Sequence, residues 1–143
     1  MNLLLVSHKG IASGVKETAG MIVGEMADDI AVIELTAEQG VEYFTQEMET
    51  YLLNWLTEGK VGIIFADLMG GTPYNRAEMM LAKHGLKERC KVVSGMNVCM
   101  VIDALEREID QWNMQVLQEI MQVGQEGIGC MDLLSASDDG TDE

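Results

Sequence analysis

The fold of this chain is decided by the stretch Val61-Gly62-Ile63-Ile64-Phe65-Ala66-Asp67-Leu68-Met69-Gly70-Gly71-Thr72-Pro73-Tyr74-Asn75. Its first six residues form an apolar run, which predicts a strand buried on both faces. An acid, two glycines and a hydroxyl residue follow, and residues 76–84 are then typical of a helix. In an open α/β sheet, ligands bind where the carboxyl end of a strand turns into a helix. The stretch therefore predicts a parallel sheet and the edge at which its site lies.

The same pattern occurs at the start of the chain. Leu3 to Val6 is another apolar run, and Ser7-His8-Lys9-Gly10 follows it. One strand thus ends in a histidine and the other in an aspartate. In a sheet with strand order 2-1-3-4 these two strands are neighbours, so we expect His8 and Asp67 to meet at the topological switch point. The alternative for Asp67 is that its carboxylate only caps the turn.

Strand and helix patterns alternate along the rest of the chain. The predicted strands are 3–6, 30–35, 61–66 and 91–94, and the predicted helices are 13–26, with Ser13 as cap, 41–56, 76–84, 98–108 and 112–123. This order predicts a three-layer α/β/α fold around an open, mostly parallel sheet of strand order 2-1-3-4. The segment Ile128 to Leu134 is predicted to be either a last strand or a docked extended segment.

Length and charge limit the classes of function. At 143 residues the chain is expected to form one domain, residues 1–134, followed by an acidic and disordered tail, residues 135–143. The net charge of −15 argues against nucleic acid as a partner, because the sequence has no basic stripe to displace counterions, and it favours partners with a basic patch.

Further sequence features bear on compartment and cofactors. Cys90, Cys99 and Cys130 lack the spacing of a zinc site or a disulfide framework, so neither metal nor cofactor is expected. The N-terminus lacks the pattern of a signal peptide, and no apolar run approaches the length of a membrane span. We therefore expect a cytoplasmic protein without direct membrane insertion.

The chemistry of the two strand ends favours phosphoryl transfer. A neutral histidine nitrogen is available at cellular pH and acts as a nucleophile when the other ring nitrogen is held. The Asp67 carboxylate would fix the His8 tautomer and stabilise the charged ring that forms. Gly70, Gly71 and Thr72 would stabilise phosphate oxygens through backbone N–H groups, a hydroxyl and the following helix start. The alternative for the glycine pair is a tight turn.

Two further polar residues are more ambiguous. Asn97 follows the fourth strand at the same edge, where it either supports the site loops or caps the next helix. His84 precedes Gly85 at the predicted end of a helix, where it favours the helix dipole.

Together these residues resemble a family. Ser7-His8-x-Gly10, Asp67-x-x-Gly70-Gly71-Thr72-Pro73-Tyr74-Asn75 and Gly95-Met96-Asn97 are similar to motifs of the IIA component of the mannose/fructose/sorbose class of the bacterial sugar phosphotransferase system. The similarity covers roughly residues 1 to 127. Three features depart from the family pattern. Leu68 replaces a residue that is often small and hydroxylated, Met69 replaces one that is often aromatic, and the family's His-Gly step becomes His8-Lys9-Gly10.

The resemblance implies a phosphotransferase that acts as a phosphocarrier. His8 would accept a phosphoryl group from the carrier protein HPr, as a tele-phosphohistidine, and pass it to a histidine of a separate IIB component. Asp67 would orient the imidazole. The sugar would be chosen by membrane IIC and IID components. The resemblance also implies a homodimer in which a C-terminal strand, here Ile128 to Leu134, is exchanged between subunits.

Other functions remain open at this stage. One is the phosphoryl-donor subunit of a dihydroxyacetone kinase, against which the stretch from Gly70 to Asn75 argues. Another is a non-catalytic module of the same fold that binds a partner according to phosphorylation. A receiver domain with Asp67 as the acceptor is disfavoured, because the chain lacks the early acidic pair that would hold Mg²⁺.

Overall fold

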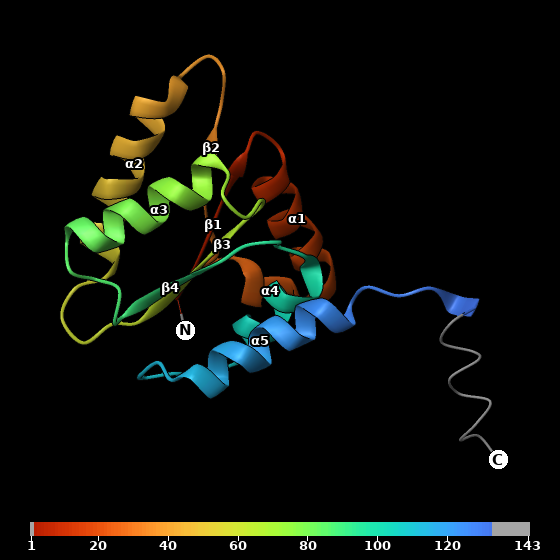
Figure 1. Cartoon of the computed structure of the whole chain (residues 1–143). Helices are drawn as coiled ribbons and strands as arrows, with labels where there is room; N and C mark the ends of the chain where they lie inside the picture. The colour runs from red at the N-terminus through yellow and green to blue at the C-terminus, as the bar shows by residue number, and fades with distance from the viewer. Residues whose placement is uncertain (1, 133–143) are drawn as a thin grey trace.

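The computed structural model describes residues 2–132 (Figure 1). Its sheet has four parallel strands in the order β2-β1-β3-β4: β1 Asn2–His8, β2 Ala31–Leu35, β3 Gly62–Ala66 and β4 Cys90–Val93. The predicted order 2-1-3-4 is confirmed. The tail predicted for residues 135–143 lies outside the described residues.

Helices cover both faces of the sheet (Figure 1). One face carries α2 (Gly40–Trp55) and α3 (Thr72–Lys83). The opposite face carries α1 (Ile11–Val23) and α4 (Val98–Leu105), and α5 (Met114–Glu126) packs against α4. A short 3-10 turn, η1 (Gly24–Ala27), follows α1. The three-layer α/β/α architecture is therefore confirmed.

The two hydrophobic cores follow from the alternation of side chains along each strand. In β1, Leu4 and Val6 pack into the core under α2 and α3, whereas Leu3 and Leu5 pack under α1 and α4. Both faces are buried, so the strand needs a continuous apolar run rather than an alternating one.

Two helices begin earlier than the sequence pattern predicts. The helix α1 begins at Ile11 rather than beside Ser13, because Gly10 takes a positive φ of 99° and turns the chain directly into the helix. The helix α3 begins at Thr72 rather than Arg76. Pro73 lies in its first turn, where the fixed φ of proline suits a helix and its missing N–H costs nothing.

The predicted C-terminal strand is not present between residues 128 and 132. Ile128 to Cys130 have no regular structure, and Met131 and Asp132 are helical. This segment extends away from the body of the molecule beyond α5 (Figure 1). A strand needs a neighbour to pair with, and within residues 2–132 this segment pairs with neither of the open strand edges, those of β2 and β4. The remainder of the predicted strand, residues 133–134, lies outside the described residues.

Gly62, the first residue of β3, is tightly packed at the end of the sheet opposite the site. A Cβ atom placed on Gly62 would lie 2.7 Å from a ring carbon of Trp55, and the Gly62 carbonyl accepts a hydrogen bond of 3.0 Å from the indole of Trp112. The first residue of β3 is therefore enclosed by two tryptophans from different layers.

We expect Gly62→Ala to lower the free energy of unfolding by about 1–3 kcal/mol, because the new methyl group overpacks against the Trp55 ring. The matched control is Gly20→Ala, since a Cβ at this position inside α1 meets no atom within 4 Å. The control should raise stability by about 0.5–1 kcal/mol through helix propensity. Urea unfolding measures both values. Equal effects of the two substitutions would contradict the packing argument.

Candidate active site

His8 and Asp67 meet at the carboxyl edge of the sheet although 59 residues separate them in the sequence. Val6 pairs with Ala66 in the β1–β3 register, so the residues that follow this pair emerge side by side. The His8 Nδ1 atom lies 2.7 Å from the Asp67 Oδ2 atom. The histidine side chain is 48% exposed and the aspartate side chain only 10%. The imidazole is thus held at one nitrogen and open to solvent.

The Asp67 carboxylate is satisfied by backbone donors as well as by the ring. The His8 N–H donates to Oδ2 at 2.9 Å, and the Leu68 N–H donates to Oδ1 at 2.9 Å. Burial alone raises the pKa of Asp67, but the hydrogen bonds from His8 and Leu68 outweigh burial and hold this pKa below its ordinary value. The carboxylate is therefore charged at neutral pH, and Nδ1 of a neutral His8 ring carries the proton.

The turn between β3 and α3 is built around the glycine pair. Gly70 takes a φ of 77°, and the Gly71 N–H donates to the Leu68 carbonyl at 3.1 Å. The amide of Asn75 donates to the Gly70 carbonyl at 2.9 Å and pins the turn to the first turn of α3. A positive φ at the third position of such a turn strongly favours glycine.

The same turn leaves donors next to the imidazole. A Cβ on Gly71 would lie 3.7 Å from the His8 Cε1 atom, an ordinary van der Waals distance, so the turn packs directly beside the ring. Within residues 2–132, the N–H of Gly70 and both the N–H and hydroxyl of Thr72 donate no hydrogen bond. Of the three residues expected to stabilise a phosphate, Gly70 and Thr72 thus keep free donors, whereas the Gly71 N–H is already used in the turn.

A second carboxylate near the site was missed by the sequence analysis. Glu34, at the end of β2, accepts the Ser13 N–H at 2.7 Å in the first turn of α1. Ser7 pairs with Glu34 in register, and its hydroxyl accepts the Ala12 N–H at 2.8 Å. The available signal was an acid at the end of a strand, in the position that faces the start of α1.

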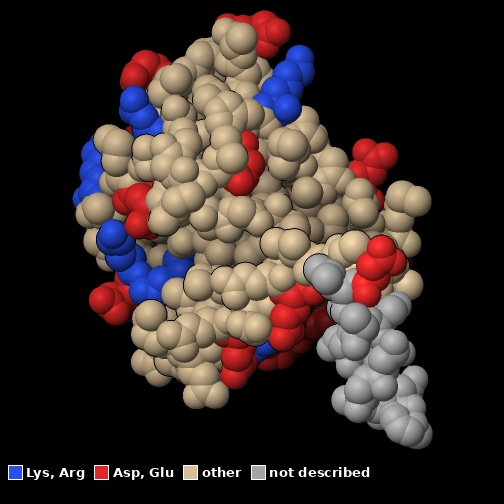
Figure 2. Space-filling model, turned by 45° about the vertical axis from the view of Figure 1, so that its right-hand side comes forward, with Lys and Arg blue, Asp and Glu red and all other residues tan. Residues whose placement is uncertain are grey.

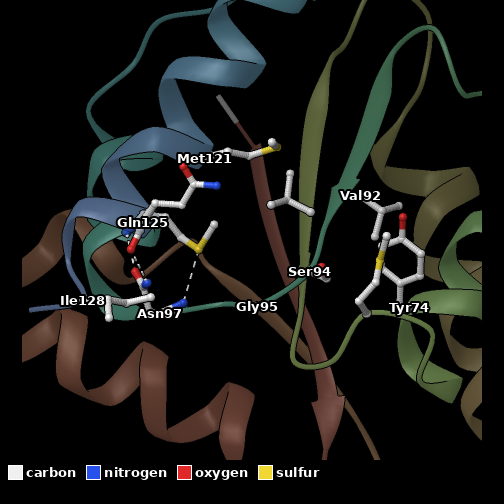
Figure 3. Close-up of a pocket in the computed structure, with 12 residues that line it drawn as sticks. Tyr74, Val92, Ser94, Gly95, Asn97, Met121, Gln125 and Ile128 are labelled. Atoms are coloured by element: carbon white, nitrogen blue, oxygen red, sulfur yellow. Dashed lines mark hydrogen bonds between the residues drawn. The ribbon is translucent and has the colours of Figure 1, made fainter.

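Asn97 acts as a helix cap. Its side-chain oxygen accepts the Met100 N–H at 3.1 Å, and its side-chain nitrogen donates to the Gly124 carbonyl at 2.8 Å (Figure 3). It therefore ties the start of α4 to α5. His84 is also engaged elsewhere, because its Nε2 atom lies 2.6 Å from Glu49 of α2.

A cleft of about 400 Å³ opens beside the site, between α3, β4 and α5 (Figure 3). Tyr74 and Val92 lie on one side of it, and Met121 and Gln125 of α5 lie on the other. The cleft runs along β4, whose outer edge pairs with no strand in the described part of the chain. Its lining is mostly apolar.

Charges are distributed unevenly over the surface. On the face drawn in Figure 2, Lys and Arg side chains gather at the left and the middle consists mostly of uncharged residues.

No group of three or more His, Cys, Asp or Glu side chains that would hold a metal ion occurs among residues 2–132. None of the helices in this range has the length and apolar character needed to cross a membrane.

Comparison with known proteins identifies a family for this chain. The family model EIIA-man, described as the PTS system fructose IIA component, matches residues 2–122. The sorbose-specific EIIA component of Lacticaseibacillus casei is 27% identical over 128 residues, which is 88% of this chain and 87% of that protein. The fructose-specific EIIA component of Bacillus subtilis (strain 168) is 28% identical over 105 residues, 73% of this chain and 68% of that protein.

Solved structures agree with the sequence comparison. The mannose/sorbose specific IIA subunit of the phosphotransferase system from Enterococcus faecalis superimposes with a TM-score of 0.78 at 29% identity, covering 90% of this chain and 92% of that chain. The family model, the related sequences and this structure all point to one conclusion: the chain belongs to the EIIA-man family of the sugar phosphotransferase system.

Proposed function

We propose that this chain is a phosphocarrier whose His8 Nε2 atom accepts a phosphoryl group from phospho-HPr and passes it to a histidine of a separate IIB component. The observation that carries this proposal is the 2.7 Å contact between His8 Nδ1 and Asp67 on a half-exposed ring. The contact engages one ring nitrogen and leaves the other as the free nucleophile.

The proposed reaction is a displacement at phosphorus. The lone pair of Nε2 forms the new N–P bond while the bond between phosphorus and the donor's nitrogen breaks. Nδ1 keeps its proton, which the Asp67 carboxylate holds while positive charge develops on the ring. The second transfer runs the same step in reverse toward the IIB histidine. No proton has to leave the site in either step.

The phosphoryl oxygens need donors that are already in place. The free N–H of Gly70 and the N–H and hydroxyl of Thr72 lie at the amino end of α3, whose dipole favours an anion. Gly71 lies beside His8 Cε1, and its N–H is already used in the turn. Leu68 and Met69 add no hydroxyl here, so the oxygen contacts of this chain come from the residues after them.

The partners follow from the family and the charge. A net charge of −15 would steer a donor or acceptor with a basic face toward this carrier. We infer a place in the cytoplasm, between HPr and IIB, with IIC and IID reached only indirectly. Two alternatives share the site with the proposed carrier: a subunit of a dihydroxyacetone kinase and a phosphorylation-sensing module. They differ from it in where the phosphoryl group of His8 goes next, so an assay of transfer to IIB distinguishes the three functions.

We also propose that the chain is a homodimer in which a C-terminal segment, beginning at Ile128, is exchanged. Three features support this: the unpaired edge of β4, the mostly apolar cleft beside it, and the outward course of a segment with Ile128 80% and Met131 75% exposed. A second copy would cover these apolar surfaces and pair the strand edge.

The substitution His8→Ala should abolish labelling by enzyme I, HPr and labelled phosphoenolpyruvate, because it removes the acceptor nitrogen. The matched control is His84→Ala, the other histidine of the chain, which should be labelled like the wild type. Peptide mapping should place an acid-labile, base-stable label on the peptide that contains His8. A base-labile label on the Asp67 peptide would instead support a receiver domain.

The substitution Asp67→Asn should slow transfer on the order of a hundredfold without removing the acceptor, because a neutral amide no longer stabilises the charged ring. Rapid-quench measurements of label transfer from phospho-HPr give the rate. Undiminished transfer would contradict the orienting role of Asp67.

The depressed pKa of Asp67 also predicts a pH dependence of stability. Its contribution is fully present above the ordinary aspartate pKa of about 4 and is lost as the pH falls through the lower folded value. The stability difference between wild type and Asp67→Asn should therefore be largest near neutral pH and shrink below about pH 4. Urea unfolding between pH 7 and pH 3 measures it, and a constant difference would contradict the prediction.

The wild-type chain should sediment as a dimer, and a chain truncated after Gly127 should sediment as a monomer, because truncation removes the proposed exchanged segment. Sedimentation velocity at several concentrations distinguishes the two states. A dimeric truncated chain would place the interface elsewhere.

A further inference from the structure

The two helices that flank His8 differ at their amino ends. The first N–H groups of α3 have no side-chain cap. At α1, by contrast, acceptors from two strands occupy the helix start: the Ser7 hydroxyl takes the Ala12 N–H and Glu34 takes the Ser13 N–H. The cap residue itself, Gly10, has no side chain to do this. The start of α1 is therefore capped from outside the helix.

This external cap lies next to the turn that follows His8, the proposed phosphoryl acceptor. His8 is the last residue of β1, and only Lys9 and Gly10 separate it from α1. The Ser7 hydroxyl, besides accepting from Ala12, donates to the His8 carbonyl at 2.6 Å. Gly10 takes a φ of 99°, and a glycine adopts positive and negative φ values about equally well, so Gly10 alone does not hold this conformation. The conformation of the turn therefore depends on the contacts at its two ends, β1 and the start of α1.

We propose that Glu34 is a positioning residue for phosphoryl transfer: by binding the first turn of α1, it holds the His8–Gly10 turn and thereby the imidazole at its contact with Asp67. The inference rests on the proposed function of His8. Glu34 does not touch the phosphoryl group in this role; it acts through α1 and the turn.

The surroundings of Glu34 agree with a permanent hydrogen-bonding role. Burial raises the pKa of Glu34, but hydrogen bonds from Ser13 and Gly10 and the charge of Lys9 outweigh burial and bring the pKa below its ordinary value. These three residues all belong to the turn or to the first turn of α1. The Glu34 carboxylate, at the end of β2, therefore interacts with the turn itself, at Lys9 and Gly10, and with Ser13 in the first turn of α1.

The charge of Glu34 also affects where an anion binds. A carboxylate at the start of α1 neutralises the partial positive charge that this helix end would present. The open donors at the start of α3 then face no competing anion site on the other side of His8. An accepted phosphoryl group is directed toward Gly70 and Thr72.

The test compares transfer from phospho-HPr in Glu34→Ala, which removes the acceptor, and Glu34→Gln, which keeps a hydrogen-bond acceptor of similar reach. We expect Glu34→Ala to lower the maximal transfer rate about tenfold, as misplacement of a reacting group does. The donor concentration at half-maximal rate should stay unchanged. Glu34→Gln should stay within about threefold of the wild type.

A matched control separates positioning from loss of stability. Asn113→Ala also removes a side-chain acceptor at a helix start, the oxygen of the N-cap residue Asn113 that accepts the Val116 N–H at 2.9 Å at the start of α5. It should lower the melting temperature as Glu34→Ala does and leave transfer unchanged. Equal slowing by Asn113→Ala and Glu34→Ala, wild-type transfer by Glu34→Ala, or no rescue by Glu34→Gln would overturn the proposal.

A second readout does not require transfer. The ¹⁵N chemical shifts of the His8 ring report how far the proton is confined to Nδ1, and this confinement should weaken in Glu34→Ala and persist in Glu34→Gln and Asn113→Ala. If the wild type takes no label while the ring signature still depends on Glu34, the proposed function fails and the positioning of His8 stands. A ring signature that ignores Glu34 would overturn the positioning itself.

Discussion

The contact between His8 and Asp67 depends on one topological constraint, the adjacency of β1 and β3 in a parallel sheet. Parallel strands end at the same edge, and the register that pairs Val6 with Ala66 brings the next residues together. One carboxylate then receives three N–H groups, from the His8 backbone, the His8 ring and Leu68. Two of these donors are backbone groups, at the end of β1 and just after β3. The orientation of the carboxylate is therefore fixed by the backbone, independently of the His8 ring.

The alternation of side chains along β1 places Ser7 and His8 on opposite faces of the sheet, where they have different roles. Ser7 points toward the α1 face and serves the helix cap, whereas His8 follows it on the opposite side and lies beside the β3–α3 turn. Successive residues of one strand thus supply a structural hydroxyl and a reactive nitrogen. Exchanging them in register would place the imidazole inside the α1 core and the hydroxyl at the solvent.

Much of this arrangement was predictable from the sequence, because it depends on local patterns. Continuous apolar runs predicted buried parallel strands, and the residues after two of them predicted the meeting of His8 with Asp67. The features that were missed depend on contacts between distant elements. Glu34 has the sequence pattern of an ordinary strand-end acid, and its role as a cap exists only because β2 lies next to the start of α1. Asn97 was ambiguous for the same reason, since its second hydrogen bond reaches Gly124 of α5.

The negative charge of the protein has to be reconciled with the acceptance of an anion. At long range a net charge of −15 would act on docking, where it would attract a proposed partner with a basic face. At short range both carboxylates described at this site are already engaged: Asp67 by three N–H groups and Glu34 by the first turn of α1. In the proposed function, an incoming phosphoryl group would therefore meet the open donors of Gly70 and Thr72 rather than unpaired carboxylates. The surface charge and the local donors thus act at different distances, so an acidic surface is compatible with the proposed anion-accepting site.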